Sequence, residues 1–442
     1  MSKLRRQAAE EVDFPDIEVG RKINPEKSTA LEEIVLYAKS RIPDRVLYEI
    51  FRKTIVNTFE TTTLKMEDGT YFVFTGDLRA MWIRDSALQI YNYIFLAKYD
   101  SVLDRVVRGT IKRQMRALCR DPYLYAFFED YSPRRRKDGH PLRKYELDSL
   151  CWPIWIAYKY WKYTGYEGVF DEDFAKGIES IVSTLETEQD HSKKSTYSAL
   201  DNLSDNDKKR HLISKENPVA YTGLVWSGFR PSDDPCQYNY LIPSLALAKV
   251  TLEYLEEIVE KFYESILMDK IVKLRSDIES GIRMYGIYDD KKRGSLYAYE
   301  VDGMGNYNLM DDANYPSLLS LPWIGYCRKD DEIYKSTRSF ILSHRNPYFY
   351  AGKVARGIGS PHRKGVWHLS LIMQALTSSS EQEIEEIIDM LASTTAGTYY
   401  MHEAFDPNRP ESFTRKWFAW ANTMFAHLMI ERHSLLDCFE NE

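Results

Sequence analysis

Two adjacent carboxylates of this chain lie in a segment that the rules of folding do not explain. Asp233 and Asp234 belong to the stretch 226–240, which is rich in aromatic residues and lacks the periodicity of a core element. Pro231 and Pro235 flank them, and each proline removes a backbone donor and restricts the residue before it. We therefore expect the two carboxylates in a shaped loop. The simpler alternative is that one of them caps the helix that follows.

The same segment has the composition of a sugar-binding cleft. Aromatic side chains such as Trp226 and Phe229 offer flat apolar faces to the C–H surfaces of a pyranose ring. Arg230 adds a charged group that can bind hydroxyls. The segment thus predicts carbohydrate chemistry without yet naming the sugar.

A third carboxylate, Glu403, is flanked by His402 and aromatic residues near the end of the chain. A helix-dipole role is the structural alternative, but Pro407 and Pro410 separate Glu403 from the last predicted helix. Together with one Asp of the pair, Glu403 supplies what glycosidic cleavage needs, one protonated carboxyl and one ionised carboxylate. An inverting enzyme holds two such groups roughly 6.5 to 9.5 Å apart, which leaves room for a water molecule.

Four further segments, 77–86, 146–149, 300–316 and 357–362, are dense in polar and charged residues without an amphipathic pattern. Capping, surface ion pairs and turns explain any one of their residues taken alone. A guanidinium beside a carboxylate, as in Trp-x-Arg-Asp, can also hold vicinal hydroxyls in a fork. A site assembled from several loops explains all of these segments together.

Composition and charge narrow the class of protein. The net charge of −7 and the pI near 5.8 argue against a broad nucleic-acid-binding surface. No apolar run of about 18 residues and no secretory signal is visible, so we expect a cytoplasmic protein that does not enter membranes. Five scattered cysteines and the lack of a His-x-x-x-His pattern predict no metal site and no cofactor. Nothing in the sequence indicates an obligate protein partner.

Helical periodicity dominates the chain, and strand signals are confined to 70–74 and 295–301. We expect an all-α fold with a few short strands in loops. Residues 1–25 are predicted to form an N-terminal extension, and 26–442 a single catalytic domain with a polar surface excursion at 186–215. The predicted helices cover 29–41, 44–62, 84–99, 101–119, 147–164, 172–187, 236–262, 264–284, 313–326, 330–343, 364–379, 381–393 and 412–434. Polar loops precede six of these helices, which suits a closed barrel of paired helices with its site at one rim.

The motifs resemble glycoside hydrolase family 125, the exo-acting α-1,6-mannosidases, in family order from about 45 to 430. The resemblance rests on Asp77-x-x-Ala-Met-Trp-x-Arg-Asp-Ser86, Glu146-Leu-Asp-Ser149, Trp226-Ser-Gly-Phe-Arg-Pro-Ser-Asp-Asp234, Glu300-Val-Asp-Gly303, Met310-Asp-Asp-Ala-Asn314, Gly357-Ile-Gly-Ser-Pro-His362, His402-Glu403 and Trp417-Phe-Ala-Trp-Ala-Asn422. It implies an (α/α)6 barrel that removes terminal α-1,6-linked mannose by metal-independent, inverting hydrolysis. The implied substrates are α-mannoside oligosaccharides or N-glycan fragments.

The resemblance also implies roles for individual residues. Glu403 looks like the general base, and the general acid is Asp233, with Asp234 as the alternative. Arg84, Asp85, Asp148, Arg230, Asp312, His362 and Trp420 are implied to bind the terminal sugar, and the same motifs contribute Asp77, Trp82, Trp226, Glu300, Asn314 and His402 as further candidates.

The chain departs from the family pattern at a few positions. Ala404 stands where the family has Ser, Arg363 where it has a small hydroxyl residue, and His368 where Pro is usual, while Pro235 directly follows the Asp pair. None of these changes removes a catalytic carboxylate, but Arg363 bears on what the leaving-group side accepts.

Three alternatives remain at this point: a catalytically silent glycan-binding protein on the same fold, a hydrolase or phosphorylase for another terminal hexose, and a helical scaffold for protein partners. Retention of both acids disfavours the first, a carboxylate base disfavours a phosphorylase, and polar aromatic loops disfavour a scaffold.

Overall fold

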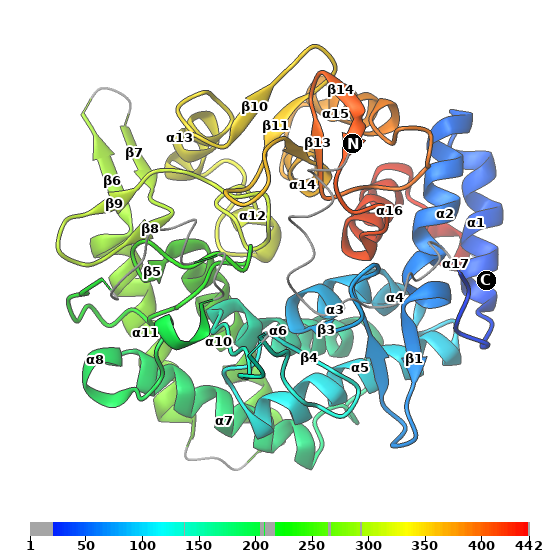
Figure 1. Cartoon of the computed structure of the whole chain (residues 1–442). Coiled ribbons are helices and arrows are strands. Elements are labelled where there is room, and N and C mark those ends of the chain that lie inside the picture. Colours follow the sequence, from blue (N-terminus) through cyan, green and yellow to red (C-terminus); the bar gives the residue numbers. More distant parts are fainter. Residues whose placement is uncertain are drawn as a thin grey trace.

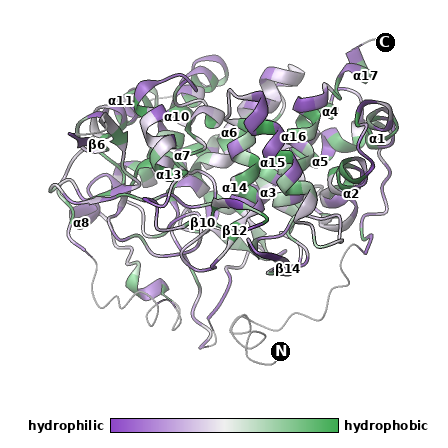
Figure 2. Cartoon of the chain, turned by 90° about the horizontal axis from the view of Figure 1, so that it is seen from above, coloured by the Kyte–Doolittle hydropathy of each residue, from purple (hydrophilic) through white to green (hydrophobic). Residues whose placement is uncertain are grey.

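Two concentric rings of helices make up the structure, and short strands gather at one end of them (Figures 1 and 2). The computed structural model describes residues 21–136, 138–203, 207, 217–263, 267–291 and 294–440. Within these residues the inner ring consists of α3 (Ile83–Gln89) with α4 (Tyr91–Leu96), α6 (Leu147–Thr164), α10 (Ile242–Phe262), α12 (Leu321–Ile324), α14 (His368–Leu376) and α16 (Ala419–His433). The outer ring consists of α2 (Arg45–Thr61), α5 (Ser101–Arg120), α7 (Glu172–Glu188), α11 (Leu267–Tyr285), α13 (Glu332–Ile341) and α15 (Glu381–Ser393).

Packing between neighbours closes the inner ring. Helix α3 packs on α6, α6 on α10, α10 on α12, α14 on α16, and α16 returns to α3. The Tyr315 hydroxyl, in the segment before α12, donates to the Leu369 carbonyl of α14 and links the remaining pair. The predicted (α/α)6 barrel with short strands in its loops is confirmed. Helix α1 (Thr29–Arg41) packs outside α2, and the short α17 (Asp437–Glu440) packs on α1.

The two rings differ in how their side chains are distributed. Along α11 the buried side chains recur at steps of three and four, because one face covers the inner ring and the other meets solvent. Residues 147–157 of α6 and 419–430 of α16 are buried without interruption, as expected for helices covered on every side. Hydrophobic periodicity therefore predicts the outer helices well, and α15 begins and ends at the predicted residues.

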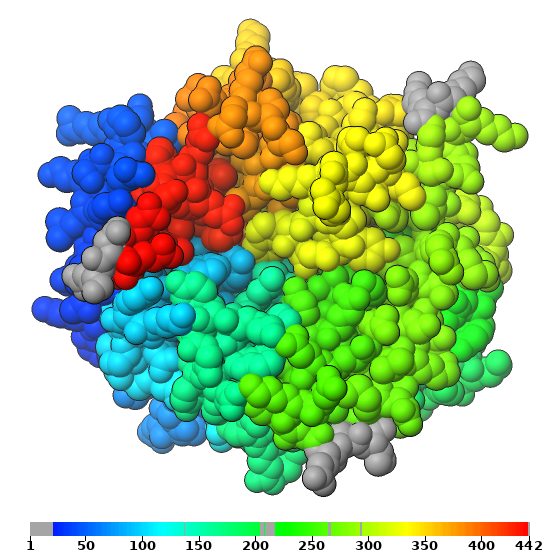
Figure 3. Space-filling view, turned by 180° about the vertical axis from the view of Figure 1, so that it is seen from behind, coloured from blue at the N-terminus to red at the C-terminus, as the bar shows by residue number. Residues whose placement is uncertain are grey.

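Large aromatic side chains fill the axis of the barrel. The ring of Tyr91 lies 5.3 Å from that of Trp155, 5.4 Å from that of Trp323 and 4.8 Å from that of His427. These residues come from α4, α6, α12 and α16, so they tie four inner helices together. Seen from behind, packed side chains close the centre of the ring (Figure 3). At this end, the core of the barrel is filled by side chains.

Short antiparallel strands lead into three of the inner helices. Strand β3 (Met81–Trp82) precedes α3 and pairs with β4 (Ala126–Phe127), β5 (Tyr240–Leu241) precedes α10 and pairs with β8 (Glu300–Val301), and β12 (Val366–Trp367) precedes α14 and pairs with β13 (Ala404–Asp406). These pairings join residues that are 37 to 61 positions apart at the N-terminal ends of the inner helices. The rest of the strands form hairpins or add to these pairs: β1 (Thr63–Lys65) with β2 (Tyr71–Val73), β6 (Ile287–Asp290) with β7 (Gly294–Tyr297), β9 (Tyr307–Asn308) with β8, β10 (Phe349–Ala351) with β11 (Arg356–Ile358), and β14 (Arg409–Phe413) with β13.

Four predicted helices are wrong at their boundaries. The helix predicted at 84–99 is broken at Ile90, and those predicted from 236, 364 and 412 begin only at Ile242, His368 and Ala419. Extended residues precede these later starts. Strands β5 and β12 lead into α10 and α14, and before α16 the backbone of Phe418 forms a bridge with Gly76. Local periodicity does not record such pairing with distant loops. Of the helix predicted at 313–326, only the four residues of α12 are helical. There Asp311 accepts the backbone N–H groups of Leu318 and Leu319 and holds the segment in turns.

Two other predictions concern segments that are described only in part. Residues 1–20 of the predicted extension, and 204–206 and 208–215 of the polar tract, lie outside the described residues. The first part of the tract forms the end of α7, then α8 (His191–Lys194) and a 3₁₀ turn at Leu200–Asn202. Among the residues that the structure describes, no helix is long and apolar enough to cross a bilayer.

Candidate active site

Charged side chains from six loops meet at the rim where the inner helices begin. Arg84 lies at their centre, at the start of α3, and it is only 2% exposed. Its Nη1 donates to Glu146 Oε2 at 2.8 Å and to Asp148 Oδ2 at 3.0 Å, and its Nε lies 3.7 Å from Asp85 Oδ1. The guanidinium also lies over the Trp420 ring, 5.8 Å from its centroid. One buried cation thus joins the N-terminal ends of α3, α6 and α16.

Burial shapes the protonation of the carboxyls around Arg84. Burial raises the pKa of Asp148, of Asp85 and, most strongly, of Glu146, although Arg84 opposes the rise in each case. Among the described residues, the buried atoms Arg84 Nε and Asp148 Oδ1 have no hydrogen-bond partner. Buried polar atoms are rarely left unpaired, so these atoms are suited to bind the hydroxyls of a ligand.

The loop 229–235, which we call the Asp loop, separates the side chains of Asp233 and Asp234. An antiparallel bridge joins Phe229 to Pro235, and the Arg230 N–H donates to the Asp234 carbonyl at 2.8 Å. Asp233 at the tip adopts a left-handed backbone with φ of 63°, a conformation that Asp tolerates better than most residues. This turn leaves the side chain of Asp233 31% exposed, whereas that of Asp234 is 2% exposed. Asp233 is therefore the carboxylate of the pair that faces the open rim.

Neighbouring side chains determine the charge of Asp233. Burial alone would raise its pKa, but Lys144, a hydrogen bond with Glu146 and the nearby Arg84 lower the pKa below its ordinary value. The Lys144 Nζ also donates to the Asp233 carbonyl at 2.8 Å, and Arg84 Nη2 lies 4.0 Å from Asp233 Oδ1. The carboxyls of Asp233 and Glu146 thus contact each other beside a shared guanidinium.

Asp234 connects the Asp loop to the segment around His362. Its Oδ2 accepts from Ser232 Oγ at 3.2 Å and lies 3.2 Å from His362 Nδ1. Burial would lower the pKa of His362, but Asp234 and the more distant Glu403 raise it. Ser360 Oγ bridges His362 Nδ1 at 3.1 Å and Asp312 Oδ2 at 3.4 Å. The His362 imidazole is consequently a candidate donor to a sugar hydroxyl.

Asp312 completes this part of the rim. Its Oδ1 accepts both the backbone N–H of Asn314 at 3.1 Å and the side-chain amide of Asn314 at 2.9 Å. Burial raises the pKa of Asp312. Both residues are nearly fully buried, and Asn314 orients the carboxyl toward Ser360.

Glu403 lies immediately before β13, which pairs with the strand leading into α14. Its Oε2 accepts from Thr414 Oγ1 at 2.9 Å, and Arg363 Nε lies 3.7 Å from the same oxygen. Arg415 Nη1 lies 4.0 Å from Oε1. Arg363, which departs from the family pattern, is thus a direct neighbour of the expected base. The side chain of Glu403 is 10% exposed, so it retains access to the rim.

Two histidines hold the backbone of this strand. His402 is fully buried, and its ring stacks on that of Phe413 with the ring centroids 3.7 Å apart. The backbone N–H of His402 donates to His368 Nδ1 at 2.8 Å. Burial lowers the pKa of His368 to about 3, so its ring is neutral and free to accept that bond. Thr394 Oγ1 lies 3.0 Å from the other ring nitrogen. His402 and His368 therefore position Glu403 from within the protein.

The structure brings most of the predicted residues together but places three of them elsewhere. Trp226 is buried behind the Asp loop, where its ring stacks on His191 at 3.8 Å. Trp82 lies under the guanidinium of Arg134, 4.5 Å from its ring centroid. Glu300 is fully buried and binds Arg230 in a bidentate pair, with distances of 2.6 and 2.9 Å.

Asp77 lies at the edge of the rim, where it accepts from Arg415 Nε at 2.8 Å. Arg415 therefore connects Asp77 to Glu403. Residue types and spacing alone do not identify Arg415, Lys144 or Glu146 as site residues, although Glu146 belongs to the motif Glu146-Leu-Asp-Ser149. Their role depends on partners distant in the sequence, and a capping position was the simpler interpretation of Glu146.

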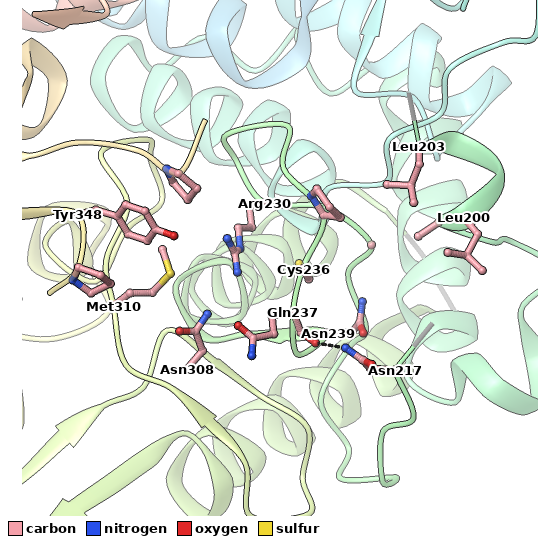
Figure 4. Close-up of a pocket in the computed structure, with 15 residues that line it drawn as sticks. Leu200, Leu203, Asn217, Arg230, Cys236, Gln237, Asn239, Asn308, Met310 and Tyr348 are labelled. Carbon is pink, nitrogen blue, oxygen red and sulfur yellow. Dashed lines mark hydrogen bonds between the residues drawn. The ribbon is translucent and has the colours of Figure 1, made fainter. Parts of the chain in front are cut away.

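A cavity of about 400 Å³ lies against the Asp loop (Figure 4). Arg230, Cys236 and Gln237 line one side, and Met310 and Tyr348 face them from across the cavity. Gln237 and several asparagines give it an amide-rich lining, which suits a neutral polyhydroxylated ligand. The cavity lies beside the carboxylate cluster, on the flank of the Asp loop.

The pair of Arg230 and Glu300 gives a stability prediction. Glu300→Ala is expected to lower the free energy of unfolding by about 3 kcal/mol or more, because it leaves the buried Arg230 guanidinium unpaired. Asp330→Ala is the matched control, since Asp330 binds Arg328 in the same bidentate geometry on the surface. Its effect should stay below about 1 kcal/mol. Denaturant unfolding of both variants checks this prediction, and equal effects would contradict it.

Comparison with known proteins agrees with this geometry. The model of the family of metal-independent α-mannosidases, GH125, matches residues 44–430. The meiotically up-regulated gene 157 protein of Schizosaccharomyces pombe is 37% identical over 438 residues, which cover 91% of this chain and 86% of that protein.

Solved structures give the same result. A metal-independent α-mannosidase of Streptococcus pneumoniae, solved in a non-productive complex with α-1,6-mannobiose, is 39% identical, with a TM-score of 0.86 over 92% of this chain and 97% of its own. A glucoamylase of Saccharomycopsis fibuligera shares the fold at 12% identity, with a TM-score of 0.60 over 96% of this chain and 99% of its own. On the strength of the family match and these relatives, the chain belongs to GH125, the metal-independent α-mannosidases.

Proposed function

We propose that this protein is an exo-acting, inverting hydrolase that removes α-1,6-linked mannose from the non-reducing ends of oligosaccharides. The observation that carries the proposal is the pair of carboxylates, Asp233 and Glu403, each with its own partners at the open rim of the barrel. The 39% identity to an enzyme solved with α-1,6-mannobiose supports the choice of sugar and linkage.

In the proposed reaction the two carboxyls act from opposite sides of the sugar. Asp233 in its protonated form gives a proton to the glycosidic oxygen as the bond from that oxygen to the anomeric carbon breaks. Glu403 takes a proton from a water molecule whose oxygen bonds to the anomeric carbon from the other face. The products are β-mannose and the oligosaccharide shortened by one sugar, and one water molecule is consumed.

The cluster around Arg84 would hold the terminal mannose. Arg84, Asp85 and Asp148 offer charged donors and acceptors, and Trp420 offers an aromatic face beside them. The aromatic side chains that fill the barrel axis close the site behind this cluster. A site closed at its inner end would admit the end of a glycan chain, as exo-acting hydrolysis requires.

The sugars beyond the cleaved bond would lie next to the Asp loop, because the acid must reach the glycosidic oxygen. The amide-lined cavity on the flank of that loop offers them Gln237, Asn308 and Tyr348. Arg363 adds a cation next to Glu403 at the same rim. Oligosaccharides of α-mannose and N-glycan fragments are the substrates that fit this arrangement.

The proposed function has a direct test. The protein is mixed with α-1,6-mannobiose without added metal, and the anomers of released mannose are followed by NMR. We expect β-mannose to appear first and to convert slowly to the equilibrium mixture. Early α-mannose would overturn the inverting mechanism. Binding without any release would indicate a glycan-binding protein, and faster release from another terminal hexose would contradict the choice of sugar.

A further inference from the structure

Glu146 is a carboxyl of the site that is neither the proposed acid nor the proposed base, and it is not among the groups that would hold the mannose. It is fully buried at the N-terminal end of α6, and its Oε2 accepts from Arg84 Nη1 at 2.8 Å and from Ser149 Oγ at 3.1 Å. Its second oxygen, Oε1, is buried, and no N–H or hydroxyl group of the described residues donates to it. Oε2 is thus saturated, while Oε1 is free to interact with a group from outside α6.

That group is the carboxyl of Asp233. Both carboxyls flank the Arg84 guanidinium: Glu146 Oε2 lies 2.8 Å from Nη1, and Asp233 Oδ1 lies 4.0 Å from Nη2. Among the described residues, no N–H or hydroxyl group donates to the buried Asp233 Oδ1. Next to burial and the charges nearby, a hydrogen bond between the two side chains raises the pKa of Glu146 and lowers that of Asp233. Two carboxylates cannot hydrogen-bond to each other unless one of them carries a proton. Two negative charges on carboxyls in contact repel each other, which also prevents both groups from ionising together. The contact therefore requires a single proton held between Glu146 and Asp233.

We propose that Glu146 is the positioning residue of the general acid, and that it shares one proton with Asp233, which Asp233 delivers to the glycosidic oxygen. This inference rests on the proposed function, in which Asp233 is the acid. Glu146 itself does not touch the substrate oxygen. It stores the proton that Asp233 would otherwise have lost to solvent before the substrate binds.

The charges around Asp233 explain why a partner is needed. Lys144 and Arg84 favour its ionised form, as does Arg134 from the loop after β4. A general acid in such surroundings would be deprotonated at neutral pH. Burial disfavours the ionised form of Glu146, so the proton of the pair resides mainly on Glu146 in the free enzyme.

The proton balance of a turnover follows from this arrangement. The shared proton passes from Glu146 to Asp233, and Asp233 gives that proton to the leaving oxygen, so that both carboxylates are then ionised beside Arg84 and Lys144. Glu403 gains one proton from water in the same step, and its loss to solvent is matched by the uptake of one proton by the pair. The cycle returns to its starting state without any other reactant.

Other titratable groups face the pair as well. Asp148 from α6 shares the Arg84 guanidinium with Glu146, and Tyr125 and Cys236 lie close enough to sense its charge. Burial raises the pKa of Tyr125 and of Cys236 well above the ordinary values, so neither group titrates near neutral pH. The fall of kcat/KM on the alkaline side of the pH–rate profile, its basic limb, should therefore reflect the loss of the proton that Glu146 and Asp233 share.

The test uses Glu146→Gln and two substrates with different leaving groups. Hydrolysis of α-1,6-mannobiose depends on proton donation, whereas α-mannosyl fluoride needs much less help. We expect kcat/KM for mannobiose to fall roughly 100-fold, within the usual range for acid catalysis, and kcat/KM for the fluoride to fall less than about fivefold. The basic limb for mannobiose should move to lower pH, because Asp233 alone must then retain the proton.

Ser149→Ala is the matched control, since Ser149 donates to Oε2 of the same carboxyl and not to Oε1. Both of its rates should stay within about threefold of the wild type. If Glu146→Gln does not fold, Glu146→Asp retains an acid with a shorter arm and should show the same dependence on the leaving group to a smaller degree. Equal losses on both substrates with an unmoved basic limb would overturn the proposal.

The outcomes also separate this inference from the proposed function. If the wild-type protein releases no mannose from α-1,6-mannobiose, the function itself fails and the inference fails with it. If the wild type is active and Asp233→Asn loses only the mannobiose reaction, the function stands. A Glu146→Gln variant with full activity on both substrates would then refute the role of Glu146 alone.

Discussion

Replacing Glu403 by glutamine is expected to reduce the release of mannose from α-1,6-mannobiose by roughly 10³-fold. The amide retains the size of the side chain and its hydrogen bond from Thr414, but it cannot accept a proton from water. Affinity for the disaccharide should stay within about threefold, because the sugar-binding groups around Arg84 are unchanged. Steady-state kinetics and calorimetric titration measure the two quantities.

A matched substitution separates this chemistry from simple perturbation of the sheet. Glu411→Gln makes the same change in β14, on an exposed side chain of the sheet that holds Glu403. Its rate should equal that of the wild type. If Glu403→Gln retained more than a tenth of the activity, the base would have to be another group.

The second large effect is expected for Asp233→Asn. An amide at this position cannot donate an acidic proton, so kcat/KM for α-1,6-mannobiose should fall by about 10² to 10⁴-fold. The rate on α-mannosyl fluoride should change far less, because fluoride departs with little protonation. Comparison of the two substrates therefore identifies the acid by its chemistry and not merely by loss of activity.

Asp234→Asn serves as the matched comparison for the neighbouring carboxylate. Asp234 is buried and contacts Ser232 and His362, so its loss should disturb the binding of both substrates in similar proportion. If Asp234→Asn instead showed the dependence on the leaving group and Asp233→Asn did not, the acid would be Asp234.

Much of the fold follows from local patterns of residues. Helices such as α5, α11 and α15 alternate buried and exposed side chains at steps of three and four, and their ranges are close to prediction. The starts of the inner helices α10, α14 and α16 were harder to delimit. These helices are buried on most sides, and the residues before them pair with distant loops. The segment before α12 shows the limit most clearly. Its turns depend on backbone N–H groups donating to Asp311, a bond between residues that apolar periodicity does not register.

The sequence by itself determined the family, the barrel of paired helices and the carboxylates available for catalysis, because these depend on residue types and on their order along the chain. Only the tertiary structure decided which carboxylate of the Asp pair faces the rim, since this follows from the left-handed backbone at Asp233. Only the tertiary structure, too, brought Glu146 against Asp233 across 87 positions of sequence and placed the Arg84 guanidinium beside both. Contacts of this kind arise when the ring closes, and no local pattern of residues encodes them.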